Sequence, residues 1–245
     1  DRHRRLRGGA DVRQHDGVAI LSGNRPEFLD AAFGVWKLGA AVVSMNWRAP
    51  PAFNHMIRVT DAKFLIVSAQ FLQAARALKA QHPHLKLFIL DPIDQAQLQA
   101  DEISLATWQE PETPVELPAV DITPSDLALV LFTSGTTKPD EPKAAPLTHQ
   151  QILYNNEAVR LKLETRHTDA DTNLGWLPFF HVMGLPVEFL GNLYVGARYA
   201  FPRLKPGPPT ADQLVQALRD TGATVMYSVP WMLEELRALA QQDPT

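Results

Sequence analysis

The segment from Val18 to Asn46 alternates between two kinds of hydrophobic pattern, and this alternation restricts the possible fold more than any other feature of the chain. It starts with the short apolar run VAIL, continues with apolar residues at helical spacing, and returns to the apolar run AAVVSM. Pro26 suits the first turn of the intervening helix, and Gly39 favours its end. The pattern predicts a strand, a helix and a second strand, which is the unit from which parallel sheets are built.

The same pattern recurs in the second half of the chain. Between Asn173 and Phe201, the residues LGWLP precede an apolar helical stretch that we expect to end at Gly196, before the strand-like ARYAF. Further on, Thr210 and Gln213 have the spacing of a capping box, which predicts a helix followed by a strand in ATVMYSV. We therefore predict an α/β fold with doubly wound, mostly parallel sheets that are flanked by helices.

The composition changes between Asp91 and Asp126. This stretch holds nine acidic residues and five prolines but no lysine or arginine. Such a composition favours an extended surface connection over an element of the core. We place a boundary near Ile122, which divides the chain into a first α/β subdomain at residues 1–122, with an acidic, proline-rich linker at about 91–126, and a second at residues 123–245.

Charge and cysteine content exclude several classes of function. A net charge of −4 gives no general attraction to nucleic acid or to an anionic membrane surface, so the expected partner is a small molecule or another protein. The absence of cysteine excludes a disulfide framework, a thiolate nucleophile and a cysteine-based zinc site, and the cytoplasm is the expected location. No run of about 18 apolar residues is present, so we expect no membrane span.

A hydroxyl-rich turn follows the apolar run LALVLF at residues 127–132, which is typical of a strand buried on both faces. Backbone N–H groups and hydroxyls at the carboxyl end of a parallel strand can bind phosphate oxygens, and a nearby lysine supplies a positive charge. The candidate phosphate-binding residues are Thr133, Ser134, Gly135, Thr136, Thr137 and Lys143. A helix should begin after Thr148, which has capping-box spacing with Gln151. The P-loop spacing is absent, so an ordinary surface turn is the alternative interpretation.

Four motifs, in order along the chain, resemble those of the adenylate-forming superfamily, which includes acyl-CoA synthetases, luciferases and the adenylation domains of peptide synthetases. TSGTT followed by PK and LTH resembles the signature loop that holds the ATP phosphates in that superfamily. ILSGNRPEFLDAAFGVWKLGAAVVSMN is similar to its early segment, and LGWLPFFHVMGL to the motif beside its acid pocket. ATVMYSVPWMLEEL resembles the strand and turn on the far side of that pocket.

This resemblance implies both an architecture and an activity. The chain would form two subdomains of the large N-terminal domain of an AMP-binding enzyme, truncated before the family's magnesium, ribose and C-terminal lysine motifs. The intact protein would use ATP and Mg²⁺ to activate a carboxylic acid as an acyl-adenylate, and would then form a thioester with CoA or with the phosphopantetheine of a carrier protein, including one in the same chain. We expect the 245 residues alone to be inactive. A noncatalytic nucleotide-binding module and a docking module of a multidomain synthase are the alternatives.

The candidate loop departs from the family pattern at several positions. Lys138 and Ala144 stand where the family usually has glycine, and Asp140 and Glu141 belong to a longer spacer. Acidic side chains that faced inward would repel phosphate. An atypical functional loop, a degenerate copy and an error in the gene model are the three explanations.

His181 is the candidate catalytic residue of the second motif. A lone histidine in an apolar stretch is more often packed in a core than functional. The resemblance instead places His181 near the substrate carboxylate and the reacting phosphate, with Phe180, Ser228 and Val229 in the wall of the acid pocket. Amino-acid-activating domains typically have aspartate after the aromatic residue, because an ammonium group needs a carboxylate partner. Histidine at this position favours a simple carboxylic acid. No residue is assigned to a metal.

Overall fold

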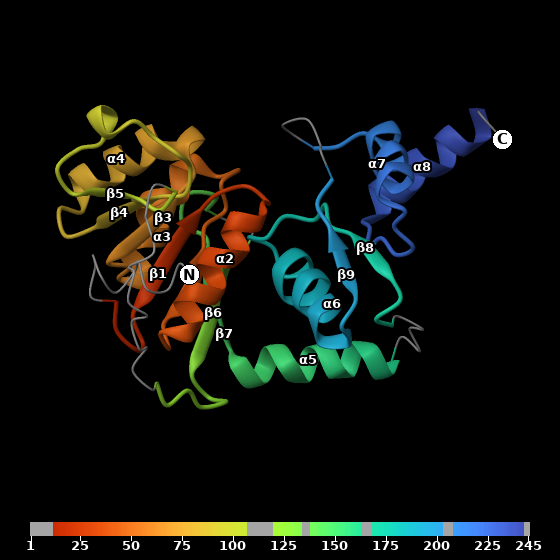
Figure 1. The fold of residues 1–245 in the computed structure, drawn as a ribbon, viewed down its shortest axis with the longest axis horizontal. Coiled ribbons are helices and arrows are strands. Elements are labelled where there is room, and N and C mark those ends of the chain that lie inside the picture. Colours follow the sequence, from red (N-terminus) through yellow and green to blue (C-terminus); the bar gives the residue numbers. More distant parts are fainter. Residues whose placement is uncertain (1–11, 107–119, 134–137, 163–167, 203–207, 243–245) are drawn as a thin grey trace, which may run out of the picture. The chain divides into compact units, whose positions relative to one another are not determined.

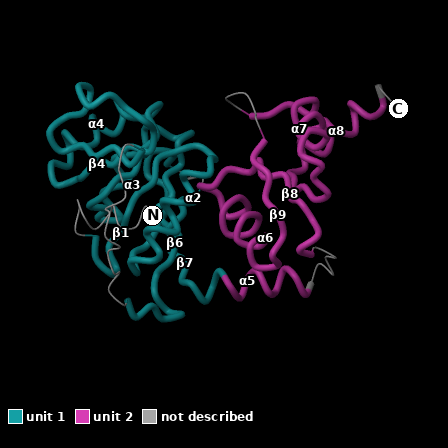
Figure 2. Tube along the Cα trace, viewed as in Figure 1, with its two compact units in different colours: residues 1–152 teal, residues 153–245 magenta. Residues whose placement is uncertain are grey.

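The computed structural model describes residues 12–106, 120–133, 138–162, 168–202 and 208–242 (Figure 1). The chain forms two compact units, Asp1–Ile152 and Leu153–Thr245 (Figure 2). Each unit contains its own sheet and its own hydrophobic core. Among the described residues, no helix combines the length and the apolar character that crossing a membrane requires.

The first unit is built on a seven-stranded, mostly parallel sheet. Its strands are β1 (Gly17–Leu21), β2 (Ala41–Ser44), β3 (Phe64–Val67), β4 (Lys86–Ile89), β5 (Glu102–Ser104), β6 (Leu127–Phe132) and β7 (Ala144–Thr148), in the spatial order β5-β4-β3-β1-β2-β6-β7. Every neighbouring pair is parallel except β6 and β7, which are antiparallel. The predicted α/β class with a mostly parallel sheet is therefore confirmed.

Helices α2 (Pro26–Lys37), α3 (Phe53–Thr60) and α4 (Leu72–Gln81) connect strands of this sheet, with short 3₁₀ turns η1 (Pro50–Ala52), η2 (Ala69–Phe71) and η3 (Gln95–Gln97). Helix α5 (His149–Lys162) follows β7 and leads into the second unit. The predicted strand, helix and strand at Val18–Asn46 are present as β1, α2 and β2, and Gly17 pairs with Ala41 in parallel register. Pro26 is the first residue of α2, and Gly39 adopts a positive φ of 68°, which glycine tolerates without a steric penalty.

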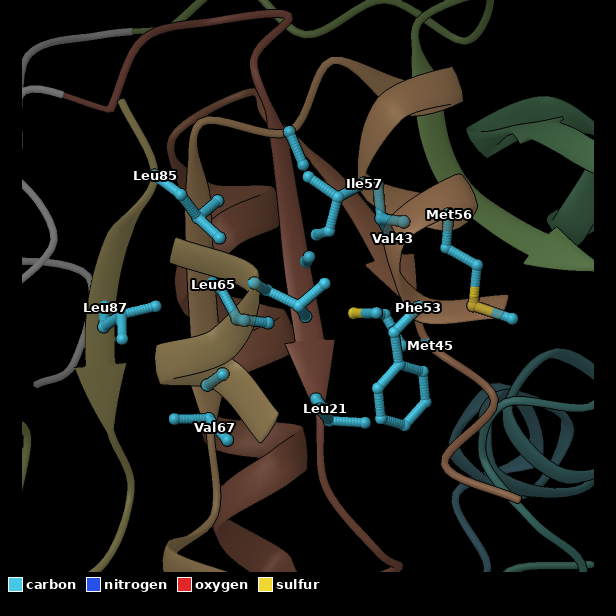
Figure 3. Packing of buried hydrophobic residues seen from close by; sticks show 14 of the residues in the cluster. Leu21, Val43, Met45, Phe53, Met56, Ile57, Leu65, Val67, Leu85 and Leu87 are labelled. Carbon is cyan, nitrogen blue, oxygen red and sulfur yellow. The ribbon is translucent and has the colours of Figure 1, made fainter. Parts of the chain in front are cut away.

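The core of this unit explains why its strands are apolar without alternation. One face of the sheet packs Leu21, Val43 and Leu65 against Phe53 and other side chains of α3 (Figure 3). The alternate residues Val18, Ile20, Ile66 and Phe88 are also fully buried. Both faces of the parallel sheet are thus shielded from water. Burial of each such side chain stabilises the folded state by about 1.5–3 kcal/mol.

Part of the acidic stretch at 91–126 is a strand, which corrects its interpretation as a surface connection. Residues Glu102–Ser104 form β5, which pairs in parallel with β4 at the edge of the sheet. The Glu102 side chain is fully buried, and Arg76 of α4 neutralises it with two hydrogen bonds of 2.7 and 2.8 Å. An acidic residue can enter the sheet because this partner comes from another element.

The two compact units divide the chain at a different place from the predicted subdomains. Strand β6 follows the predicted boundary near Ile122, yet it pairs with β2 and so belongs to the first sheet. The units meet inside α5, between Ile152 and Leu153. The predicted subdomain boundary and the division into compact units are therefore different partitions of the chain.

Among the described residues, the second unit contains the part of α5 from Leu153 onward, a two-stranded parallel sheet and further helical segments. The strands are β8 (Thr172–Leu174) and β9 (Arg198–Ala200), and the helical segments are the π-helix η4 (Met183–Phe189), α6 (Leu190–Val195), α7 (Ala211–Thr221) and α8 (Pro230–Gln242). Helix α6 ends at Gly196, whose φ is 76°. The capping box at Thr210 and Gln213 is present at the start of α7, with hydrogen bonds of 3.4 and 3.0 Å. These local predictions are confirmed.

The strand predicted in ATVMYSV is absent, which is a second correction. Only Val225 forms an isolated bridge, to Asn173 of β8. Residues Met226–Val229 after this bridge belong to no strand, and the Tyr227 carbonyl accepts a 2.7 Å hydrogen bond from the Trp176 indole. The apolar side chains of this segment instead pack against the core of α7 and α8, as Val229 does. Burial, and not strand pairing, accounts for their hydrophobicity.

Candidate functional site

The candidate phosphate loop connects β6 to β7 in the first unit. Phe132, the last residue of β6, pairs with Ala144, the first residue of β7. Above this pair, the Thr133 N–H donates a 3.0 Å hydrogen bond to the Lys143 carbonyl. The loop therefore leaves the sheet at the carboxyl end of β6 with its two ends joined. Its central residues Ser134, Gly135, Thr136 and Thr137 lie outside the described part of the chain.

The charged side chains of this loop fall into two groups. Lys138 and Glu141 form a 3.0 Å ion pair, which raises the pKa of the lysine and lowers that of the glutamate. The Asp140 and Glu141 residues are both exposed. Lys143 is also exposed, and its ammonium group makes no ion pair or hydrogen bond with a described residue. Glu141 is thus occupied by Lys138, whereas Lys143 is available to an anion.

Helix α3 braces the second half of this loop. The His55 Nε2 atom donates a 3.1 Å hydrogen bond to the carbonyl of Pro142, and its Nδ1 atom accepts one of 3.2 Å from Arg58. The neutral Nε2–H tautomer satisfies both contacts. Pro142, which is buried, precedes Lys143, so this brace fixes the backbone from which the lysine side chain extends. Analysis of the sequence missed the brace, because His55 and Pro142 are far apart along the chain.

His181 lies in a turn between β8 and η4 in the second unit, and it is exposed. Its N–H donates to the Pro178 carbonyl at 3.0 Å, and its Nδ1 atom accepts from the Met183 N–H at 3.2 Å. Because Nδ1 is an acceptor, a neutral ring carries its proton on Nε2. The ring can then donate a hydrogen bond through Nε2. The alternative of a packed core histidine does not hold.

The helix that follows His181 has π-type hydrogen bonds. The Val187 N–H donates to the Val182 carbonyl at 3.1 Å, which is a bond between residues five apart. Pro186 has no N–H to donate, but it lies in the first turn, one residue before Val187, where the helix requires no donor. A Cβ atom at position 184 would lie 2.1 Å from the Pro178 carbonyl oxygen. Gly184 has no Cβ atom and so avoids this clash. Such π segments are frequent at functional sites.

The aromatic residues before His181 have different surroundings. Phe179 is buried, and its ring lies 5.9 Å from that of Phe189 and 6.1 Å from that of Phe201, measured between centroids. Phe180, the predicted pocket residue, is half-buried. Phe179 therefore anchors the turn, and Phe180 remains the candidate for substrate contact.

Ser228 and Val229 precede α8. Val229 packs against the core of α7 and α8. The Ser228 hydroxyl is buried and has no hydrogen-bond partner among the described residues. Both residues belong to the same compact unit as His181. An unpaired buried hydroxyl costs free energy, so Ser228 has hydrogen-bonding capacity to spare.

Comparison with known proteins decides the family. The model of the family described as AMP-binding enzyme matches residues 4–245, which include the loop after β6 and the His181 turn. The chain belongs to this AMP-binding enzyme family.

Relatives of this AMP-binding chain are longer than it is. A feruloyl-CoA synthase of an Amycolatopsis species is 28% identical over 231 residues, which are 94% of this chain and 41% of the relative. The structure of apo MbtA from Mycobacterium smegmatis superposes with a TM-score of 0.79 at 28% identity, covering 96% of this chain and 42% of MbtA. The anthranilate CoA ligase AuaEII in complex with anthranoyl-AMP has the same fold, with a TM-score of 0.78, 24% identity, and coverage of 93% and 42%. The chain spans about two fifths of these proteins.

The AMP-binding chain also contains a buried carboxyl group that sequence analysis did not single out. Glu188 of η4 is fully buried, and it accepts hydrogen bonds from Asn173 at 3.1 Å and from the Tyr199 hydroxyl at 3.2 Å. Burial raises its pKa to about 8, although these bonds and one from the Leu177 N–H oppose the shift. Burial, followed by the charge of Glu188, raises the pKa of Tyr199 and of Tyr227.

The described residues include no group of three or more His, Cys, Asp or Glu side chains that could hold a metal ion. Two candidate donors among the described residues are the Lys143 ammonium, which has no described partner, and the ring N–H of His181. Both suit the oxygen atoms of an anion.

Proposed function

We propose that the intact protein activates a carboxylic acid with ATP to form an acyl-adenylate. The observation that carries this proposal is the family match over residues 4–245, because it spans both the loop after β6 and the His181 turn. In the proposed reaction, a carboxylate oxygen attacks the α-phosphorus of ATP. A P–O bond forms to the acid, the P–O bond to the β-phosphate breaks, and pyrophosphate leaves with the electron pair.

The loop after β6 is the proposed site for the ATP phosphates. Thr133 would supply its hydroxyl, since its N–H is bonded to the Lys143 carbonyl. Ser134, Gly135, Thr136 and Thr137 would supply backbone N–H groups and hydroxyls, and Lys143 a positive charge. The exposed ammonium of Lys143, which has no partner among the described residues, supports this role, as does the hydrogen bond from His55 that fixes the backbone before it. These groups would offset charge on the phosphates as the reaction proceeds. Mg²⁺ bound with the ATP would neutralise further phosphate charge.

The proposed role of His181 is to orient the acid. Its Nε2–H would donate to a carboxylate or phosphate oxygen, since Nδ1 is already engaged by the Met183 N–H. Phe180, Val229 and the unpaired Ser228 hydroxyl are the proposed pocket residues. A histidine in this position offers no carboxylate to an ammonium group, so we propose an acid without an α-amino group.

The second step and its location are also proposals. We propose that the acyl group passes to CoA or to the phosphopantetheine thiol of a carrier protein, with release of AMP. The relative named feruloyl-CoA synthase and the structural neighbour named anthranilate CoA ligase favour CoA and make aryl acids the first substrates to test. The cytoplasm is the proposed location.

ATP–pyrophosphate exchange tests the activity. The intact protein should incorporate labelled pyrophosphate into ATP only when a suitable acid is present, and ferulate, anthranilate and fatty acids form the first panel. Exchange by the 245-residue chain alone should be absent. ATP binding by the intact protein without exchange for any acid would favour a noncatalytic nucleotide-binding module. Absence of ATP binding would favour a docking module.

A further inference from the structure

The Glu188 carboxyl joins four segments of the second unit. Its own residue lies in η4, Asn173 belongs to β8, and Tyr199 belongs to β9. The Leu177 N–H, in the loop after β8, also donates to it. In addition, Asn192 of α6, which continues η4, donates a 2.6 Å hydrogen bond to the Glu188 carbonyl. The side chain of Glu188 therefore holds the π-helix against β8, β9 and the loop after β8.

No positive charge contacts this carboxyl among the described residues. Its contacts there are an amide, a phenol and a backbone N–H, and the titratable groups that interact with it are Tyr199 on β9 and Tyr227 before α8. Full burial without a cation makes the carboxylate costly, although three donors oppose this effect. A proton on Oε2 can be donated to the Tyr199 hydroxyl oxygen, 3.2 Å away, while Oε1 still accepts from Asn173.

The same segments carry the His181 turn. Leu177 immediately precedes Pro178, whose carbonyl accepts the N–H of His181 and packs against Gly184. At the other end of the turn, Met183 begins η4 and donates to the His181 ring. The carboxyl thus holds both the residue before the turn and the helix after it.

We propose that Glu188 is a positioning residue, whose buried carboxyl joins η4 to the loop after β8 and thereby fixes the orientation of the His181 ring. Ionisation opposes burial of the carboxyl and favours a locally open state in which it reaches water. The link between this turn and acid binding rests on the proposed function. The coupling between Glu188 and the turn rests only on the hydrogen bonds described above.

Hydrogen exchange of the 245-residue chain, followed by NMR, tests the coupling. The reporters are the amides of Met183 and Val187, which bond to the His181 ring and to the Val182 carbonyl. The matched variant is Glu188→Gln, which keeps the side-chain shape and cannot ionise. The control amide is Leu90 of the first unit, which bonds to the Val67 carbonyl.

Opening that exposes Glu188 should become more favourable as pH rises between the ordinary pKa of glutamate and the raised one. The ratio of wild-type to Glu188→Gln exchange rates at Met183 and Val187 should therefore rise by about tenfold per pH unit between pH 5.5 and 7.5. At Leu90 the ratio should stay constant. A constant ratio at Met183 and Val187, or an equal change at Leu90, would overturn the coupling between Glu188 and the turn.

A second measurement covers the case in which the variant does not fold. In wild-type protein carrying ¹³C-labelled glutamate, the Glu188 carboxyl should titrate near pH 8, and the ¹⁵N shift of His181 Nδ1 should move with the same midpoint. A Glu188 midpoint below pH 5, or a His181 shift that ignores it, would contradict the proposal. These readouts need no substrate, so an enzyme inactive toward every acid would overturn only the proposed function.

Discussion

The Nδ1 atom of His181 accepts a hydrogen bond from the N–H of Met183, 3.2 Å away. This bond selects the tautomer with the proton on Nε2 and limits rotation of an exposed ring. The turn between Pro178 and Met183 thus presents a donor on an exposed ring. The helix that begins at Met183 maintains the bond, so the orientation of the ring depends on the packing of η4.

Replacing His181 with Ala should separate activity from stability. Because the side chain is exposed, we expect the free energy of unfolding to change by about 0.5 kcal/mol or less. Acid-dependent ATP–pyrophosphate exchange by the intact protein should fall by about a hundredfold or more, as is typical when a positioned donor is lost. His84→Ala, at an exposed histidine of the first unit, is the control and should exchange normally. Unfolding of His181→Ala with full activity per folded molecule would contradict the site assignment.

Replacing Lys143 with Ala should weaken ATP binding. The ammonium group has no partner among the described residues, so its removal leaves no buried charge and should not affect folding. Calorimetry of the intact protein should show a loss of about tenfold or more in ATP affinity, because a charge-assisted contact to phosphate contributes about 1.5–3 kcal/mol. Lys37→Ala, at the exposed end of α2, serves as the matched control. Equal affinities for wild-type protein and Lys143→Ala would refute the assignment of this lysine and leave the family unchanged.

Neutralising the two acids of the loop should have little effect. Asp140 and Glu141 are exposed, and Glu141 is paired with Lys138. We expect the double variant Asp140→Asn, Glu141→Gln to bind ATP within about twofold of wild type, since exposed ion pairs contribute about 0–1 kcal/mol. The same calorimetric titration measures it. A large gain in affinity would instead show that the natural acids disable the loop.

Removing the arginine beside the buried Glu102 should destabilise the first unit. The Glu102 side chain is fully buried, and Arg76 lies 2.7 Å from it. Arg76→Ala leaves this carboxylate without its cation, so we expect a loss of about 3 kcal/mol in urea unfolding at pH 7. Lys79→Ala breaks a pair with the largely exposed Asp101 and should cost less than about 1 kcal/mol. Similar losses in both variants would argue against a structural role for β5.

The stability of the second unit should decrease as pH rises from about 5 to 8. The raised pKa of Glu188 means that the folded state keeps a proton that the unfolded state releases above its ordinary pKa. The stabilisation is complete below that ordinary value and is lost at up to about 1.4 kcal/mol per pH unit until the folded pKa near 8 is reached. Urea unfolding of wild type and Glu188→Gln, followed through NMR signals of the second unit, measures the difference. Parallel pH profiles would contradict the prediction.

Local sequence patterns determined the elements whose signals lie within a few residues. The helix α2 between β1 and β2, the capping box at Thr210, and the helix end at Gly196 were all predicted, because caps and helical periodicity depend on near neighbours. The family resemblance rested on the same short motifs. The predicted strand at ATVMYSV failed because an apolar run does not distinguish strand pairing from burial beneath a helix.

The tertiary structure alone decided which distant residues meet. Glu102 enters a sheet because Arg76 neutralises it, and the backbone beside Lys143 is held because His55 reaches Pro142. Glu188 was not singled out from the sequence, and only the packing of η4 against β8 and β9 makes it a buried acid with a raised pKa. The free energy of burying a polar group depends on the partners that the fold brings to it, and a sequence pattern does not encode those partners.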